Sequence, residues 1–315
     1  MNSQNQYINP EESENQILSE PLHAWGGAWT EEKLNSFEKY VKAYLTIMNK
    51  YREQYGWKLI YFDGCAGSGS RTESFQEVDS PLMKDLFDDN VLSPQELNIY
   101  KGSAERVLSI PQRGFDYYYF IDKDPESSIR LHEHLSKFQN DHVLVYRNSD
   151  ANHQVKILAE AMKKDNRYAS LVFLDPFGMQ VNWDSIKKLQ NTRTDLWILI
   201  PTGVIVNRLL DRKGKLEHID KLKTFFGKGE EFLRNYFYTT NTERTLFGDV
   251  EIIQKVEMPI QKIAELYISQ LKTVFKHVTE KPQVLYNTRN TPIFHFACAS
   301  NNPTAIKIAE QIIQK

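Results

Sequence analysis

The feature that most constrains the fold is a short apolar strand that runs directly into a glycine-rich turn. Residues 57–71 read Trp-Lys-Leu-Ile-Tyr-Phe-Asp-Gly-Cys-Ala-Gly-Ser-Gly-Ser-Arg. The strand ends in Asp63, and three glycines follow it, at Gly64, Gly67 and Gly69. Glycines let a backbone approach a ligand closely, and a carboxylate accepts hydrogen bonds from the ligand's polar groups. The junction therefore predicts a strand end that holds a nucleoside-like ligand.

Spacing separates the glycine-loop chemistries that compete for this turn. A phosphate-binding P-loop needs a lysine after its second glycine, and none follows Gly69. A dinucleotide loop needs a third glycine, but that position is Thr72. What is left is D-x-x-A-G-x-G, which resembles the first motif of class I methyltransferases that use S-adenosylmethionine (SAM). An ordinary strand-to-turn junction is the competing interpretation.

Three further strands also end in or beside carboxylates. The predicted strand over 115–121 ends at Asp122, the one over 143–146 is followed by Asp150, and the one over 170–174 ends at Asp175. Helical segments separate these strands, and a strand over 195–200 follows them, so the pattern predicts a parallel α/β sheet with ligands at the carboxyl ends of its strands. Independent solvated acids are the alternative to a shared ligand crevice.

The chemistry of SAM assigns expected roles to these residues. The backbone from Asp63 to Gly69 is expected to pack against the methionine part of the cofactor, with Asp63 near its ammonium group. The cofactor-binding residues of this turn are expected to be Asp63, Gly64, Ala66, Gly67 and Gly69. Asp122 is expected to accept from the ribose hydroxyls and Asp150 from the adenine amine. Asp124 competes for the ribose, although a solvated residue before Pro125 is the simpler interpretation.

The sequence Asp175-Pro176-Phe177-Gly178 stands where amine-methylating enzymes carry their catalytic motif. Such enzymes need a carboxylate and a carbonyl to hold an exocyclic amine, and an aromatic ring to stack on the base. Asp175, Pro176 and Phe177 are the expected catalytic residues in these roles. The motif is similar to that of the tRNA guanine-N2 dimethyltransferases. A plain strand-to-helix turn is the alternative, because turns favour Pro and Gly.

The segments before, between and after these motifs also have predicted structures. Residues 1–29 are predicted to be a flexible segment, a helix is predicted over 30–55, and 72–99 is interpreted as an insertion or lid. A helical insertion without strands is expected at about 205–281, and an antiparallel hairpin is expected over 283–299. Residues 207–228 hold seven Lys or Arg against three acids, which either track a nucleic-acid backbone or form a solvated helix face.

Composition excludes several classes of protein. The net charge of the 315 residues is −2, so nucleic-acid binding would need a local patch. No apolar run approaches the ~20 residues of a membrane span, which favours a soluble cytoplasmic protein without a membrane partner. Two cysteines, Cys65 and Cys298, are too few to hold a metal alone, and no metal site is expected.

Taken in order, the motifs resemble the three-Cys-motif partner proteins. The resemblance rests on the helix before the glycine loop, 62–69, Gly102-Ser103, 174–178 and the ending at 291–303. It implies a methyltransferase-like fold and a radical-SAM-like partner that carries the cysteines. Two departures are Cys65, where phenylalanine is frequent, and the absence of a second proline after Asp175.

The expected fold is thus a Rossmann-like class I methyltransferase fold, mostly parallel with an antiparallel C-terminal hairpin, plus an N-terminal helix and a helical insertion. The leading functional hypothesis is a SAM-dependent methyltransferase acting on an exocyclic amine of a nucleobase, in RNA rather than DNA. The alternative is a non-catalytic partner of a radical-SAM-like three-Cys-motif protein. A nucleotide hydrolase is disfavoured because no phosphate-binding lysine follows the loop.

Overall fold

The computed structural model describes residues 28–69, 102–176, 178–245, 248–287 and 289–314. The predicted lid at 72–99, the predicted stacking residue Phe177 and residues 1–27 of the predicted flexible segment lie outside these ranges. Ala28 and Trp29, the last two residues of that segment, belong to the first described helix. The main domain therefore begins slightly earlier than the sequence predicts.

An eight-stranded sheet forms the centre of the described part of the chain, in the order β3-β2-β1-β4-β5-β10-β8, with β9 also paired to β10. Its first five strands are parallel: β1 (Lys58–Asp63), β2 (Tyr117–Asp122), β3 (Leu144–Asn148), β4 (Tyr168–Leu174) and β5 (Thr194–Ile200). The antiparallel strands are β8 (His277–Val278), β9 (Gln283–Tyr286) and β10 (Pro292–Ser300). The predicted α/β fold with a mostly parallel sheet and an antiparallel C-terminal hairpin is confirmed.

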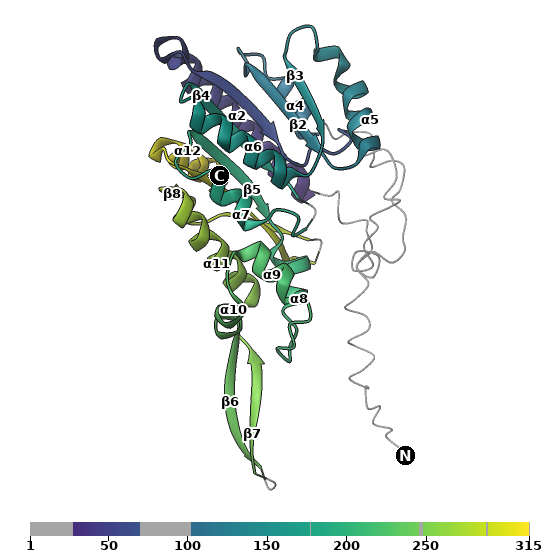
Figure 1. Cartoon of the computed structure of the whole chain (residues 1–315), viewed down its shortest axis with the longest axis vertical. Helices are drawn as coiled ribbons and strands as arrows, with labels where there is room; N and C mark the ends of the chain where they lie inside the picture. The colour runs from purple at the N-terminus through teal and green to yellow at the C-terminus, as the bar shows by residue number, and fades with distance from the viewer. Residues whose placement is uncertain (1–27, 70–101, 177, 246–247, 288, 315) are drawn as a thin grey trace, which may run out of the picture.

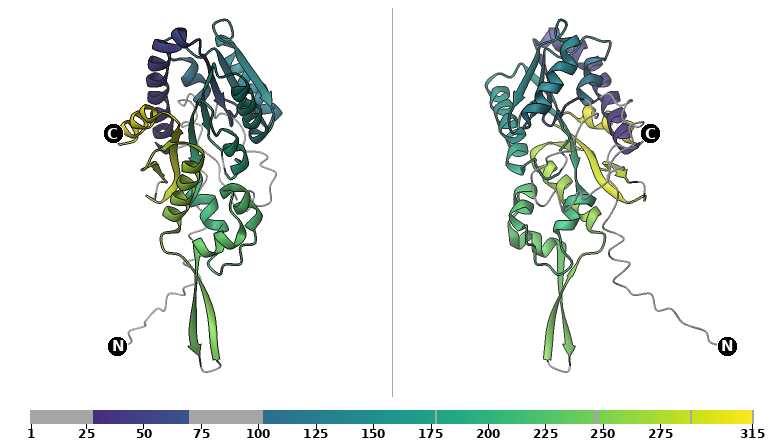
Figure 2. Two further views of the ribbon diagram at one scale, coloured as in Figure 1. Left: turned by 60° about the vertical axis from the view of Figure 1, so that its left-hand side comes forward. Right: turned by 90° about the vertical axis from the view of Figure 1, so that its right-hand side faces the viewer.

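Helices cover both faces of the sheet (Figures 1 and 2). One face packs against α2 (Ala28–Tyr55), α4 (Ser103–Leu108), α5 (Pro125–Leu135) and α12 (Pro303–Ile313). The other packs against α6 (Ala151–Lys164), α7 (Trp183–Lys188), α9 (Ile219–Phe226), α10 (Glu230–Phe237) and α11 (Pro259–Val274). Short helical turns are η2 (Ser136–Phe138), η3 (Thr202–Val206) and α8 (Asn207–Leu209).

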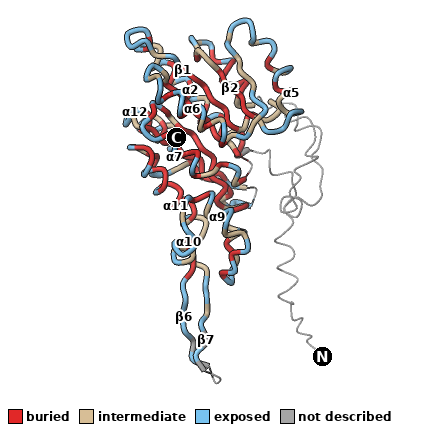
Figure 3. The backbone as a smooth tube through the Cα atoms, in the orientation of Figure 1, coloured by how far each residue is buried: buried red, intermediate tan, exposed pale blue. Residues whose placement is uncertain are grey.

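The central strands are apolar on both sides because both of their faces are covered. Six of the seven residues of β4 and six of β5 are buried, which explains why these strands read as continuous apolar runs. Figure 3 shows the buried residues concentrated along the sheet and the inner sides of its helices. The sheet is therefore a rigid support for whatever its carboxyl edge carries.

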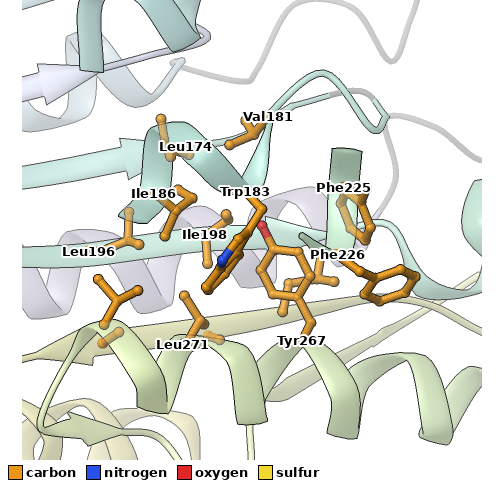
Figure 4. Packing of buried hydrophobic residues seen from close by; sticks show 14 of the residues in the cluster. Leu174, Val181, Trp183, Ile186, Leu196, Ile198, Phe225, Phe226, Tyr267 and Leu271 are labelled. Carbon is orange, nitrogen blue, oxygen red and sulfur yellow. The ribbon is translucent and has the colours of Figure 1, made fainter. Parts of the chain in front are cut away.

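The insertion after β5 is attached by aromatic packing to the face of the sheet that α6 and α7 cover. Trp183 of α7 meets the ring of Tyr267 of α11 edge-on at 5.9 Å, and Phe225 of α9 lies 4.8 Å from the same tyrosine. Figure 4 shows the side chains of Trp183 and Tyr267 next to each other near Ile198 of β5, with Phe225 on the far side of Tyr267. The inserted helices are thus fixed to the sheet by buried apolar contacts.

The prediction of an insertion without strands is wrong. Residues 238–245 and 248–255 form a two-stranded antiparallel ribbon, β6 (Tyr238–Thr245) and β7 (Gly248–Lys255), that projects from the body (Figure 1). Where its side chains are described, most of the ribbon beyond its base is exposed, so it lacks the apolar alternation that marks a half-buried strand. The helical prediction holds for α9, α10 and α11.

In the described part of the chain, no helix is both long enough and apolar enough to cross a membrane.

Candidate functional site

The glycine loop is held across the carboxyl end of β1 by hydrogen bonds to both neighbouring strands. The amide of Gly64 donates to the carbonyl of Phe173 on β4 at 2.9 Å, and the amide of Ala66 donates to the carbonyl of Ile121 on β2 at 2.9 Å. Gly67 adopts a φ of 61°, in the left-handed region that favours glycine, and a Cβ atom there would meet nothing within 4 Å. The loop therefore leaves open space above a fixed backbone.

Asp63 lies beneath this loop and is fully buried. Its carboxylate accepts hydrogen bonds from the Ser103 hydroxyl at 2.7 Å, the Tyr61 hydroxyl at 3.1 Å and the amide of Cys65 at 3.3 Å. Burial raises the pKa of Asp63 to about 7, the bond from Ser103 opposes that rise, and the charge of Asp175 adds to it. A buried carboxyl with such a pKa favours a nearby positive charge. Its predicted contact with an ammonium group stays a prediction.

Asp122 bridges the two loops that follow β1 and β2. One carboxylate oxygen accepts from the amide of Gly67 at 2.8 Å and the other from the amide of Asp124 at 2.8 Å. Burial raises the pKa of Asp122, and these backbone bonds lower it. A carboxylate has about four acceptor positions, so Asp122 keeps capacity for a ligand hydroxyl. Its predicted ribose contact is compatible with this geometry.

Two acids near these strand ends are helix caps. The Asp124 carboxylate accepts from the amide of Ser127 at the start of α5, at 2.8 Å. The Asp150 carboxylate accepts from the amides of Asn152 and His153 at the start of α6, at 2.9 and 3.2 Å. Capping alone explains why an acid stands at each of these positions. The presence of Asp150 at this position is therefore explained without the predicted adenine contact, which stays a prediction.

Asp175, at the end of β4, forms an ion pair with Lys33 of α2. The Lys33 side chain is 3% exposed and that of Asp175 is 23% exposed, so the pair is mostly buried with the carboxylate at its accessible side. The Lys33 ammonium also lies 5.3 Å from the ring centroid of Trp29, which in turn packs on Phe294 at 5.1 Å. The start of α2 is thus part of the site, and sequence reasoning missed the role of Lys33.

The residues after Asp175 connect the site to the insertion. Pro176 is buried, and a Cβ atom on Gly178 would lie 2.9 Å from the side chain of Ile205 in η3. Beside η3, the hydroxyl of Thr202 and Nδ1 of His295 are hydrogen-bonded at 2.8 Å. The insertion therefore leaves the sheet next to the predicted catalytic motif.

The side chains at this edge of the sheet suit a cationic ligand better than a phosphate. Asp63, Asp122 and Asp175 present carboxylates at one edge, and residues 64–69 contain no Lys or Arg. Lys33 and Asp175 neutralise each other, so the acidic character of this edge comes from Asp63 and Asp122. Burial also raises the pKa of the Cys65 thiol, which makes it a poor nucleophile. The described residues contain no group of His, Cys, Asp and Glu that could hold a metal.

A cavity of about 510 Å³ opens at the opposite edge of the sheet, beside the first residues of β4 and β5. On its lining, the Asp195 carboxylate accepts from the hydroxyls of Tyr40 at 2.8 Å and Ser300 at 2.5 Å. None of the residues assigned above to cofactor or substrate lines this cavity. It is a different place from the candidate site, and the ligands of open α/β sheets bind at the carboxyl ends of the strands.

Comparison with known proteins gives a weak likeness to a solved structure. No protein-family model and no curated protein match the chain. Among solved structures it is similar to the crystal structure of protein LPL1258 from Legionella pneumophila, which is described with the family model DUF519. The TM-score is 0.35 with 14% identity, and the match covers 84% of this chain and 96% of that one. A likeness at this level carries no information about function.

Proposed function

We propose that this protein is a SAM-dependent methyltransferase that acts on an exocyclic amine of a nucleobase in RNA. The observation that carries the proposal is the arrangement around the glycine loop. This loop is fixed between β2 and β4, with Asp122 on one side and the Lys33–Asp175 pair near the other. An open loop flanked by carboxylates suits a cationic nucleoside, and an acid at the next strand end suits an amine.

The chain's own residues would contribute mainly by positioning. When bound, the cofactor would supply an activated methyl group. Asp175 would accept a hydrogen of the substrate amine, and the carbonyl of Pro176 would accept the other, which directs the nitrogen lone pair. Lys33 would fix the side chain of Asp175 through their ion pair. Asp122 orders the loop through the amide of Gly67.

Local charge supports RNA as the substrate. Of the three acids in residues 207–228, Asp211 accepts three backbone amides and Asp220 pairs with Lys223. The side chains of Lys213, Lys215 and Lys221 are exposed, and basic groups of this kind contact phosphates. The segment keeps the local excess of four positive charges that follows from its seven bases and three acids.

Labelled methyl transfer from SAM to bulk RNA tests the proposal. We expect the wild type to transfer label and Asp175→Ala to lose at least about 100-fold in rate, since the variant no longer orients the amine. Asp184→Ala, which changes an exposed acid in the first turn of α7, is the matched control. Equal transfer by the wild type and Asp175→Ala would contradict the role of Asp175.

The ribbon favours a second candidate function, that of a partner of a radical-SAM-like three-Cys-motif protein. An isolated two-stranded hairpin is marginally stable in water, and β6 and β7 pair only with each other within the described residues. A partner that adds a strand to the ribbon would stabilise it. In that case, replacing residues 240–253 with a short Gly-Ser turn would abolish complex formation with such a protein and leave SAM binding unchanged.

A further inference from the structure

Two aromatic rings lie stacked on the outer side of α10. The ring centroids of Phe232 and Tyr236 are 5.7 Å apart with planes 13° from parallel. Phe232 is 42% exposed, and Tyr236 is half-buried against the core, with its hydroxyl donating to the carbonyl of Lys262 at 3.4 Å. The inner ring is therefore fixed, and the outer one is presented to solvent.

A lysine accompanies each ring. The ammonium of Lys228 lies 5.0 Å from the Phe232 centroid, and that of Lys262 lies 5.9 Å from the Tyr236 centroid. Lys262 also pairs with Glu265 at 3.3 Å. The cluster of Lys228, Phe232, Tyr236 and Lys262, here called the aromatic–lysine cluster, combines flat π surfaces with positive charge.

The aromatic–lysine cluster is connected to the basic loop at 211–216. Arg234 of α10 donates to the carbonyl of Gly214 at 2.7 Å, and its guanidinium also pairs with Glu230 at 2.8 Å. The loop itself is ordered by the Asp211 carboxylate, so the exposed side chains of Lys213 and Lys215 are held beside α10. The basic loop is thus anchored to α10 through Arg234, which is two residues from each ring and so lies on a different side of the helix.

From these contacts we infer that the aromatic–lysine cluster binds an unpaired nucleotide of the RNA substrate. The exposed ring of Phe232 would stack on a base. The ammonium of Lys228 would then move from the Phe232 ring to the phosphate next to that base. Every base has a π face, so such a platform tolerates different sequences. The inference rests on the proposed function for its choice of RNA, and it adds a contact that lies on α10 rather than at the glycine loop.

A protein partner would use this surface differently. Protein interfaces place aromatic anchors in desolvated, charge-depleted centres, whereas here each ring has an ammonium within 6 Å. Positive charge interleaved with flat rings is the pattern of single-strand nucleic-acid grooves. The cluster's chemistry therefore favours RNA, and a protein ligand is an outcome that the test can reveal.

Fluorescence anisotropy with a labelled single-stranded RNA 20-mer tests the inference. We expect Phe232→Ala to weaken binding on the order of 10-fold or more, the range of one lost base stack, and Phe232→Trp to restore it. Lys228→Ala should weaken binding and reduce the salt slope by about 0.7, the value for one phosphate contact to a single strand. Ile157→Ala, at an apolar residue of α6 that is 46% exposed, is the control and should bind as the wild type.

Wild-type affinity in Phe232→Ala would overturn the inference. Absence of RNA binding by the wild type would also overturn it, and binding of a protein at the same surface would then identify the other kind of ligand. SAM titration and methyl transfer are measured in parallel on the same proteins. If methyl transfer depends on Asp175 while Phe232→Ala binds RNA normally, the inference about the aromatic–lysine cluster is wrong and the proposed function stands. If RNA binding depends on Phe232 but no SAM binds, the enzyme proposal fails and the RNA surface stands.

Discussion

At the scale of single residues, the ion pair between Lys33 and Asp175 is the contact whose loss we expect to change the site most. The two residues are separated by 142 positions in sequence and join α2 to the end of β4. We expect Lys33→Met to lower the free energy of unfolding by about 2–4 kcal/mol, because it leaves a largely buried carboxylate without its partner. Methyl transfer should fall as well, since Asp175 would no longer be fixed.

Urea unfolding of the two single variants and the double variant checks this prediction. Lys33→Met combined with Asp175→Asn should recover stability relative to Lys33→Met alone, because no unpaired charge is left. Lys33→Arg keeps the positive charge and serves as the conservative control. Additive effects of the two single changes would show that the residues do not interact.

His295 is the residue from which we expect a pH dependence of stability. Burial lowers its pKa to about 4, and Thr202 is its hydrogen-bond partner. An unfolded histidine binds a proton near pH 6.5 and folded His295 does not, so the contribution of His295 to stability falls as the pH drops from about 6.5 to about 4. Asp63, whose pKa is raised to about 7, contributes in the opposite direction, so the effect of His295 is read from the difference between the wild type and its variant. The loss of unfolding free energy that comes from His295 is about 3 kcal/mol in total. His295→Gln should remove this slope, measured as unfolding free energy at pH 7 and pH 4.5, and an unchanged slope would contradict the assignment.

At the scale of elements, the docking of α9 depends on the glycine at its C-terminus. Gly227 has a φ of 63°, and a Cβ atom there would lie 2.0 Å from the Trp183 ring. We expect Gly227→Ala to destabilise the protein by about 3 kcal/mol through backbone strain and displacement of that ring. Gly229→Ala is the matched change, because its Cβ would meet nothing within 4 Å, and it should cost less than about 1 kcal/mol. Equal losses of thermal stability would contradict this account.

The parallel strands could be predicted from the sequence because they are apolar and end at polar turns. The predicted strand over 170–174 lies within β4, and the one over 195–200 covers all but the first residue of β5. The ribbon at 238–255 could not be predicted in the same way. Its strands bury no continuous face, and residues such as Thr239, Thr240 and Asn241 are exposed. Pairing between two exposed strands leaves no periodic apolar signal.

At the scale of the whole molecule, the sequence predicted which residues would share an edge but not how they pair. Parallel topology alone brings Asp63, Asp122 and Asp175 to one edge of the sheet. Lys33 was not predicted as their neighbour, because contact between α2 and the end of β4 depends on how the helix packs across the sheet. The capping role of Asp150 was also missed, although an acid just before an amphipathic helix is a known N-cap signal.

Calorimetric titration of the purified full chain with SAM and S-adenosylhomocysteine asks whether the carboxyl edge of this sheet binds SAM, as we propose. We predict saturable binding with a Kd below about 100 μM, weakened in Asp122→Asn and retained in Asp124→Asn, which changes the neighbouring cap of α5. No binding of either compound to the wild type, at concentrations well above about 100 μM, would contradict the claim.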